Sequence, residues 1–195
     1  MAYELVVIGA SWGGLNALEI ILAALPEDFQ LAVAITQHRG RNTGNLLSQL
    51  LQRHSLLPVL EVEDKNPIIP AHIYLAPSDY HLLVEPGHFA LSTEAPVLYA
   101  RPSINLLFES AADAYTHRVI GVILTGANRD GAQGLAAVKK RGGLAIVQDP
   151  TEAESRAMPT AAIAATQVDY ILPVAEIASY LIKLADRGEK YELLG

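Results

Sequence analysis

Three residues with the chemistry of a hydrolytic triad each follow an apolar stretch that predicts a buried strand. Ser11 follows the first such stretch, His38 follows the second, and Asp130 comes after a later one at 119–124. A serine hydroxyl acts as a nucleophile when a base takes its proton, and histidine is such a base near neutral pH. A carboxylate then holds the imidazole in the correct tautomer. These residue types indicate nucleophilic catalysis, provided that the fold brings them together.

The segment Gly9-Ala10-Ser11-Trp12-Gly13 joins a predicted strand to a predicted helix and has three interpretations. It fits the G-x-S-x-G nucleophile elbow in the strand–turn–helix context that this pattern requires. It also resembles the G-x-G-x-x-G dinucleotide-binding turn, although Ser11 replaces the middle glycine and the next strand ends in Gln37-His38 instead of an acidic residue. In the third interpretation Ser11 only caps the helix. The segment alone leaves all three open.

The composition is that of a folded protein without disulfides. Hydrophobic residues make up 51% and charged residues 18% of the 195 residues, which is enough for a sizeable core. Cysteine is absent, which excludes a thiol nucleophile and a cysteine-based metal site. The sequence contains no signal-type stretch and no run of membrane-spanning length, so we expect a cytoplasmic protein without direct membrane insertion. The net charge of −7 argues against nucleic acid as a partner.

Strand-like and helix-like segments alternate along most of the chain, which predicts an α/β fold. We expect a doubly wound, mainly parallel sheet with helices on both faces. Residues 81–91 break the alternation and predict an inserted antiparallel β-hairpin. The last helices are expected at 161–166 and 174–187, after a polar loop at 149–159 that can itself contain a short helix, and Ser103 is expected to cap an earlier helix. The chain is expected to form a single domain, 1–195, with a short polar tail at 188–195.

In a doubly wound sheet the functional site lies beyond the carboxyl ends of the strands. That rule selects the loops at 9–14, 37–42, 125–131 and 149–159, and these loops contain Ser11, His38 and Asp130. The remaining histidines lie elsewhere and are interpreted as surface or internally satisfied residues: His54, His72, His81, His88 and His117. An ordinary α/β-hydrolase is not expected, because its triad runs in the order serine, acid, histidine.

Five motifs occur in a characteristic order: Gly9-Ala10-Ser11-x-Gly13-Gly14, Gln37-His38, Arg101-Pro102-Ser103, Leu124-Thr125-Gly126 and Asp130-Gly131. This series resembles the catalytic domain of the chemotaxis protein-glutamate methylesterases, the CheB family. The likeness extends from Leu5 to about Leu184. It implies that Ser11 is the nucleophile, His38 the general base and acid, and Asp130 the residue that orients His38, with no cofactor and no metal.

The resemblance also implies a reaction and a partner. The reaction is hydrolysis of γ-glutamyl methyl esters on the cytoplasmic helices of chemoreceptors, or of a related methylated sensory protein, with release of methanol. Family members can also deamidate receptor glutamines. Many carry an N-terminal phosphoreceiver domain that is missing here, so we expect a stand-alone form. A catalytically silent scaffold for receptor or kinase helices, and a nucleotide-binding protein, are the alternatives.

The chain departs from the family pattern on both sides of the expected oxyanion hole. Trp12 follows the serine where the family often has Thr or Ala, and Ala127-Asn128-Arg129 stands where a Met and small residues are typical. We expect the backbone N–H groups of Trp12 and Ala127 to form the oxyanion hole, because a side-chain change need not remove a backbone donor. The Trp12 ring either contacts the substrate or packs at the helix start.

Arginines are frequent in the loops at or near this edge of the sheet. Because arginine binds carboxylates in pairs, these residues would suit an acidic helical substrate. The alternative is that loops simply carry charges at the surface. The expected substrate-binding residues are Arg39, Arg101 and Arg129, and two further arginines, Arg41 and Arg156, belong to the same set.

Overall fold

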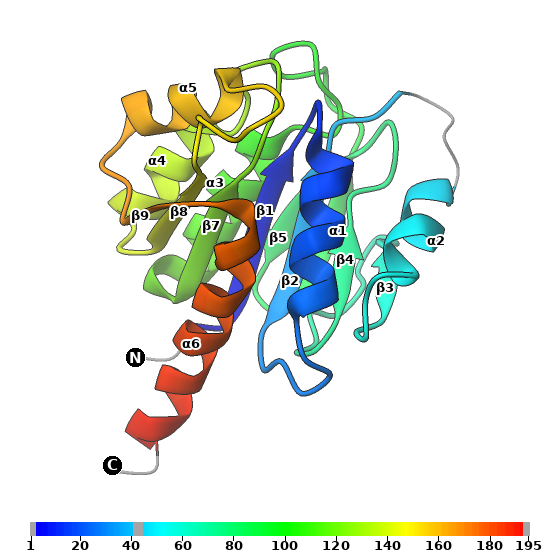
Figure 1. Ribbon diagram of the computed structural model, residues 1–195. Helices are drawn as coiled ribbons and strands as arrows, with labels where there is room; N and C mark the ends of the chain where they lie inside the picture. The colour runs from blue at the N-terminus through cyan, green and yellow to red at the C-terminus, as the bar shows by residue number, and fades with distance from the viewer. Residues whose placement is uncertain (1–2, 41–44, 193–195) are drawn as a thin grey trace.

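The computed structural model describes residues 3–40 and 45–192, and for 187–192 only the backbone. Its centre is a parallel seven-stranded sheet in the order β3-β4-β2-β1-β7-β8-β9 (Figure 1). The strands are β1 (Leu5–Ala10), β2 (Ala32–Gln37), β3 (Val59–Glu61), β4 (Ile73–Leu75), β7 (Val119–Ile123), β8 (Leu144–Gln148) and β9 (Tyr170–Leu172). The helices are α1 (Gly14–Ala24), α2 (Leu46–Gln52), α3 (Ile104–Tyr115), α4 (Ala132–Lys140), α5 (Ala157–Ala165) and α6 (Val174–Glu192).

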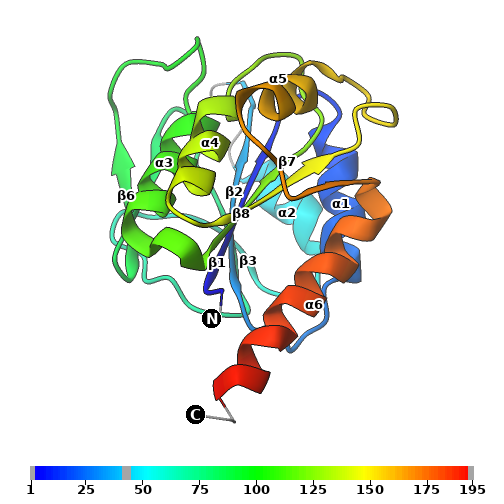
Figure 2. The ribbon, with the colours of Figure 1, turned by 90° about the vertical axis from the view of Figure 1, so that its left-hand side faces the viewer.

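Helices cover both faces of the sheet, which confirms the doubly wound α/β prediction. Figure 2 shows the sheet nearly edge-on, with α3 and α4 on one side and α1 and α6 on the other. Every residue of β1 is buried, as expected for a central strand covered on both faces. Its alternate side chains therefore enter two separate cores: Val6 and Ile8 pack with α1 and α6, and Leu5 and Val7 pack with α3.

The predicted β-hairpin is also confirmed. Strands β5 (His81–Glu85) and β6 (His88–Ser92) form a separate antiparallel pair that packs outside α3. A hydrogen bond from the Val84 N–H to Ser110 Oγ, 3.0 Å long, joins the hairpin to that helix. The hairpin therefore covers α3, whose first residues approach the site described below.

The strand order explains why the predicted site residues meet. β1 pairs in parallel with β2 on one side and with β7 on the other. The loops that follow these three strands carry Ser11, His38 and Asp130, so the three residues leave the same edge of the sheet from adjacent strands. This edge is also where the chain reverses its winding direction, the usual position of a site in an open α/β sheet.

Two helix boundaries differ from the sequence prediction. α5 begins at Ala157, inside the expected polar loop, because Pro159 lies in its first turn, where a missing N–H costs nothing, and Met158 is buried. α6 continues to Glu192 instead of ending at 187, which shows that Gly188, a weak helix breaker, does not end it. Among the described residues, no helix is long and apolar enough to cross a membrane.

Candidate active site

The backbone of Ser11 is held from two neighbouring strands. Its N–H donates to the Thr125 carbonyl at 3.0 Å, from the loop after β7. Its carbonyl accepts from Gln37 Nε2 at 2.8 Å, at the end of β2. The helix that follows is capped by Gly13, with no side-chain capping bond, so the interpretation of Ser11 as a helix cap is wrong. The serine is therefore fixed at a strand–helix turn while its hydroxyl is not used for capping.

Close packing brings the loop after β7 against Ser11. A Cβ atom on Gly126 would lie 2.9 Å from Ser11 Cβ and 2.6 Å from Met158 Cε. Because real Cβ contacts are longer than this, only glycine lets the two loops approach so closely. The Thr125 hydroxyl strengthens the junction by donating to the Trp12 carbonyl at 2.9 Å.

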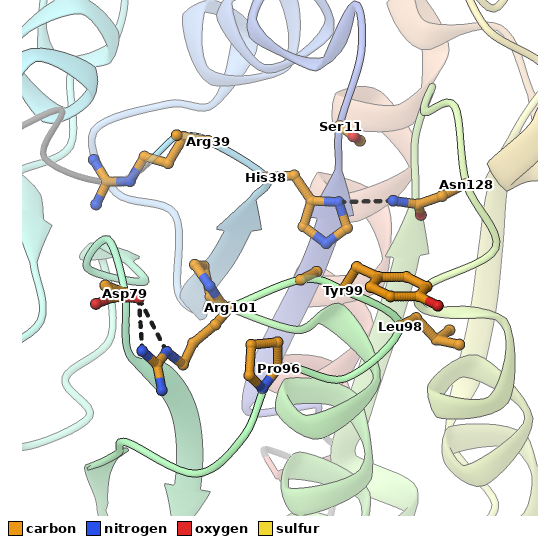
Figure 3. A pocket seen from close by; sticks show the side chains of 12 residues that line it. Ser11, His38, Arg39, Asp79, Pro96, Leu98, Tyr99, Arg101 and Asn128 are labelled. Carbon is orange, nitrogen blue, oxygen red and sulfur yellow. Dashed lines mark hydrogen bonds and ion pairs between the residues drawn. The ribbon is translucent and has the colours of Figure 1, made fainter.

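His38 and Asp130 form a direct hydrogen bond. His38 Nε2 lies 2.8 Å from Asp130 Oδ2, and the Asp130 side chain is fully buried. The structure thus brings together the two residues expected to be base and orienting carboxylate. The other ring nitrogen, Nδ1, lies 3.2 Å from Asn128 Nδ2 (Figure 3). Within the described part of the chain, Ser11 Oγ makes no hydrogen bond with His38, although both residues line the same pockets.

The Asp130 carboxylate is bound by three donors from the start of α3, here called the Asp130 cradle. Ser103 Oγ donates at 3.0 Å, the Ile104 N–H at 2.7 Å and the Asn105 N–H at 3.0 Å. The two free N–H groups and the positive end of the helix dipole favour a negative charge at this position. Asp130 thereby caps α3 from a different part of the chain.

The cradle corrects one sequence-based expectation. Ser103 does occupy the N-cap position of α3, but its hydroxyl makes no capping bond. It donates to Asp130 instead, because the carboxylate already satisfies the helix N–H groups that the serine would have capped. Ser103 is in turn held by His81, whose Nδ1 accepts the Ser103 N–H at 3.2 Å. The buried His81 is therefore internally satisfied, as expected.

The environment of Asp130 sets its charge. Burial raises the pKa of the carboxyl, whereas the hydrogen bonds from His38 and from the Ile104 and Asn105 N–H groups lower it. The donors outweigh the burial, so the pKa lies below its ordinary value. Asp130 is thus an anion that accepts a hydrogen bond from the imidazole.

Ser11 and His38 lie where two pockets meet. One pocket, of about 480 Å³, is lined by both residues together with Asn128 and residues 96 and 98–102. The other, of about 570 Å³, lies on the side of Trp12, Ala127 and Glu154. The N–H groups of Trp12 and Ala127 make no hydrogen bond within the described residues, so both donors are available beside Ser11. A substrate that reached the Ser11 hydroxyl would contact both pockets.

Three exposed side chains that line these pockets, together with the exposed Arg129 next to Asn128 in the chain, are here called the rim: Trp12, Leu98, Tyr99 and Arg129. Trp12 is 65% exposed, so its interpretation as a packed aromatic is wrong. Leu98 and Tyr99 form a two-residue turn with φ of 49° and 65°, closed by hydrogen bonds between Val97 and Ala100. Residues other than glycine pay about 1–2 kcal/mol each for this conformation, and such strain is concentrated at functional sites. The turn leaves the Tyr99 ring fully exposed.

The expected substrate-binding arginines differ in their surroundings. Arg39 pairs with Glu61 and donates to the Ala76 carbonyl at 2.8 Å. Arg101 pairs with Asp79 at 2.7 Å, as Figure 3 shows, and also donates to the carbonyls of the segment 93–94. Arg39 and Arg101 thus hold the pocket wall together, whereas Arg129 is exposed at the rim. Arg156 is also exposed, and Arg41 lies outside the described residues.

Sequence reasoning assigned no part in the active site to several residues that complete it. Gln37, Ser103, Thr125 and Asn128 each hydrogen-bond to a triad residue or to its loop. All four are polar residues within or beside the quoted motifs. Their position within or beside the motifs could have indicated that they belong to the site. Their hydrogen-bond partners could not be predicted, because these lie on other elements.

Comparison with known proteins adds the family. The family model described as CheB methylesterase matches residues 6–181. The crystal structure of the Thermotoga maritima CheB methylesterase catalytic domain superposes with a TM-score of 0.90 at 33% identity, covering 94% of this chain and all of that one. The fold, with its site at the carboxyl ends of β2, β1 and β7, is therefore that of a methylesterase catalytic domain. The chain belongs to the CheB methylesterase family.

Curated relatives span different lengths. A Leptospira interrogans protein, named "Putative protein-glutamate methylesterase/protein-glutamine glutaminase", is 46% identical over 185 residues, which is 94% of this chain and 96% of that protein. Protein-glutamate methylesterase/protein-glutamine glutaminase 2 of Anaeromyxobacter dehalogenans is 41% identical over 93% of this chain but 53% of its own length. Protein-glutamate methylesterase FrzG of Myxococcus xanthus is 37% identical over 94% and 55%.

Proposed function

We propose that this protein hydrolyses glutamyl methyl esters on methyl-accepting chemoreceptors, or on a related methylated sensory protein, and releases methanol. Ser11 is the nucleophile, His38 the general base and acid, and Asp130 the carboxylate that orients His38. The observation that carries the proposal is the 2.8 Å hydrogen bond between His38 and Asp130 beside Ser11, in a chain of the CheB methylesterase family. The names of the relatives supply the substrate class.

The proposed reaction has two halves. Ser11 Oγ attacks the ester carbonyl carbon while its proton passes to His38 Nδ1, and the resulting imidazolium is stabilised by Asp130 through Nε2–H. The same proton then goes to the departing methoxide, which leaves as methanol, and the glutamyl group remains esterified to Ser11. A water molecule gives a proton to Nδ1 and attacks this ester. The proton returns to Ser11 Oγ, and the products are the free enzyme and a glutamate side chain.

The oxyanion of each tetrahedral intermediate requires donors on the side away from His38. The proposed donors are the N–H groups of Trp12 and Ala127, which line the second pocket and make no other hydrogen bond in the described part of the chain. Preorganised backbone donors of this kind stabilise developing charge without reorganisation. The side chains at these two positions can therefore differ from the family pattern without loss of the donors.

Methanol release from a methylated receptor fragment tests this function. The wild-type protein is compared with Ser11→Ala and with Ser48→Ala, which removes a hydroxyl from α2 outside both pockets. We expect release by the wild type and by Ser48→Ala, and loss of release in Ser11→Ala. Release that survives in Ser11→Ala would remove the nucleophile from the proposal, and no release by any of the three would favour the scaffold alternative.

Glutamine deamidation is proposed as a second reaction of the same site. The steps are the same, except that His38 gives its proton to a departing amine and ammonia is released. The relatives named protein-glutamine glutaminase support this reaction. Ammonia release from a fragment with glutamine at the modified position, again compared with Ser11→Ala, is the test. Both reactions fit the cytoplasmic location predicted from the sequence, because the predicted substrates are cytoplasmic helices.

A further inference from the structure

The proposed general base, His38, is hydrogen-bonded to the side-chain amide of Asn128. His38 Nδ1 is the ring nitrogen that does not face Asp130, and Asn128 Nδ2 lies 3.2 Å from it (Figure 3). Ser11 Oγ, which would be its partner in catalysis, makes no hydrogen bond to it within the described residues. Asn128 is half-buried and lines the pocket that contains both Ser11 and His38.

The direction of this hydrogen bond follows from its neighbours. Asn128 Oδ1 accepts the Asp130 N–H at 3.0 Å, so the amino group is the end of the amide that faces His38. The ionised Asp130 carboxylate can only accept, so His38 carries its proton on Nε2. Nδ1 therefore holds the lone pair, and the Asn128 amino group donates to it.

An imidazole nitrogen has one lone pair, so two donors compete for it. We propose that Asn128 caps the His38 lone pair and must release it before Ser11 can transfer its proton. Asn128 is then a positioning residue that sets the reactivity of the nucleophile in the absence of substrate. The inference rests on the roles proposed above for Ser11 and His38. A neutral hydrogen bond of this kind corresponds to about a two- to tenfold effect on reactivity.

A small fluorophosphonate tests the inference because it reacts with an activated serine and needs no receptor contacts. Ser11 Oγ bonds to phosphorus, fluoride leaves, and the hydroxyl proton passes to His38 Nδ1. The rate constant of labelling is measured by mass spectrometry at neutral pH. We expect Asn128→Ala to label about two to ten times faster than the wild type, since the lone pair is then free for Ser11.

Asn128→Asp is expected to have the opposite effect. It keeps an oxygen for the Asp130 N–H and so retains the loop anchor, but it places a carboxylate beside Nδ1. That charge favours a proton on Nδ1, so labelling should slow by more than about tenfold at neutral pH and recover as the pH rises. A role in loop structure alone would slow both variants without this pH-dependent recovery. Faster labelling of Asn128→Ala together with slower labelling of Asn128→Asp is therefore the result that indicates capping.

Asn66→Ala is the matched control. Asn66 is also half-buried and accepts a backbone N–H with Oδ1, that of Glu63 at 2.7 Å, but it lies outside both pockets. Its loss should leave the labelling rate unchanged. Equal or slower labelling of Asn128→Ala, with Ser11 still labelled in the wild type, would overturn the capping role and leave the proposed function intact. Absence of Ser11 labelling in the wild type would overturn both.

Discussion

The Asp130 cradle and the rim both adjoin Ser11 and His38, but they are built in opposite ways. In the cradle, a buried carboxylate receives hydrogen bonds from Ser103, from two backbone N–H groups and from His38. At the rim, Trp12, Tyr99 and Arg129 project into solvent. The geometry of the cradle is determined by several partners at once, whereas the rim side chains are exposed and make no side-chain hydrogen bond within the described residues.

This difference suggests that the cradle serves proton transfer and the rim serves substrate binding. Groups whose positions decide a proton transfer must be held to a fraction of an ångström, and the cradle does this for His38 through Asp130. Groups that contact a protein substrate gain more from accessible apolar and charged surface, which the rim offers. We therefore expect changes in the cradle to lower kcat and changes at the rim to raise KM.

The largest effect is expected for Asp130→Asn. The amide cannot orient His38 as the carboxylate does, and it turns a donor toward the N–H groups of α3, so kcat should fall by about 10³- to 10⁴-fold. Methanol release under saturating substrate measures this. Asp169→Asn is the control, because Asp169 also accepts a backbone N–H, that of Ala145, but lies away from Ser11. A loss of less than tenfold in Asp130→Asn would contradict the role of the cradle.

The same carboxylate predicts a pH dependence of stability. The pKa of Asp130 in the folded protein lies below its ordinary value of 3.8, so its stabilising contribution is complete above that value and is lost as the pH falls through the folded pKa. The difference in unfolding free energy between the wild type and Asp130→Asn should therefore be constant near neutral pH and shrink below about pH 4. Urea unfolding at a series of pH values measures it, and a difference that grew on acidification would contradict the prediction.

Ser103→Ala is a milder test of the cradle. It removes one of the donors to Asp130 and leaves the helix N–H groups in place. A hydrogen bond to a charged group is worth about 1.5–3 kcal/mol, so we expect about a tenfold or larger loss in kcat with little change in KM. Steady-state kinetics with the methylated fragment separate the two parameters. A change confined to KM would place Ser103 in substrate binding instead.

The triad illustrates what could be predicted from the sequence. The placement of Ser11, His38 and Asp130 at one edge followed from a general rule of parallel sheets, and strand order brought them together as expected. The capping role of Asp130 could not be predicted, because its donors lie 25 to 27 residues earlier in the chain. The local pattern pointed to Ser103 as the cap, and a tertiary contact displaced it.

The arginines also show what a sequence does not reveal, namely which charged side chains are paired in the folded protein. From sequence, Arg39, Arg101 and Arg129 look equivalent, since all are loop cations near one sheet edge. Only the folded chain shows that Glu61 and Asp79 pair with two of them. Pairing with distant carboxylates depends on tertiary contacts that a one-dimensional pattern does not contain.

Trp12→Ala should have a moderate effect at the rim. The ring is largely exposed, so its loss should not alter stability, but a substrate helix would lose an aromatic contact. We expect KM to rise about three- to tenfold with kcat unchanged. Kinetics are measured with the receptor fragment and with a short glutamyl methyl ester peptide. The substitution should raise KM for the fragment but not for the short peptide, which is too small to contact Trp12. An equal loss for both substrates would argue against a role in binding the larger one.

The smallest effect is expected for Arg129→Ala. An exposed charge contributes about 0.2–1 kcal/mol to a contact with a carboxylate and is screened by salt. KM should rise about two- to threefold at low salt, and this difference should vanish at high salt. Arg101→Ala, whose cation already pairs with Asp79, is the comparison and should lower the melting temperature instead. An Arg129→Ala effect that persists at high salt would argue against a charge contact.

The division between cradle and rim is tested most directly by a double-mutant cycle. Methanol release by Ser103→Ala, by Trp12→Ala and by the double variant gives three values of kcat/KM relative to the wild type. If the cradle acts on the chemistry and the rim on binding, the two losses multiply, and the double variant loses the product of the two factors. A double variant no worse than Ser103→Ala alone would mean that both residues act on the same step, and would contradict this account of the site.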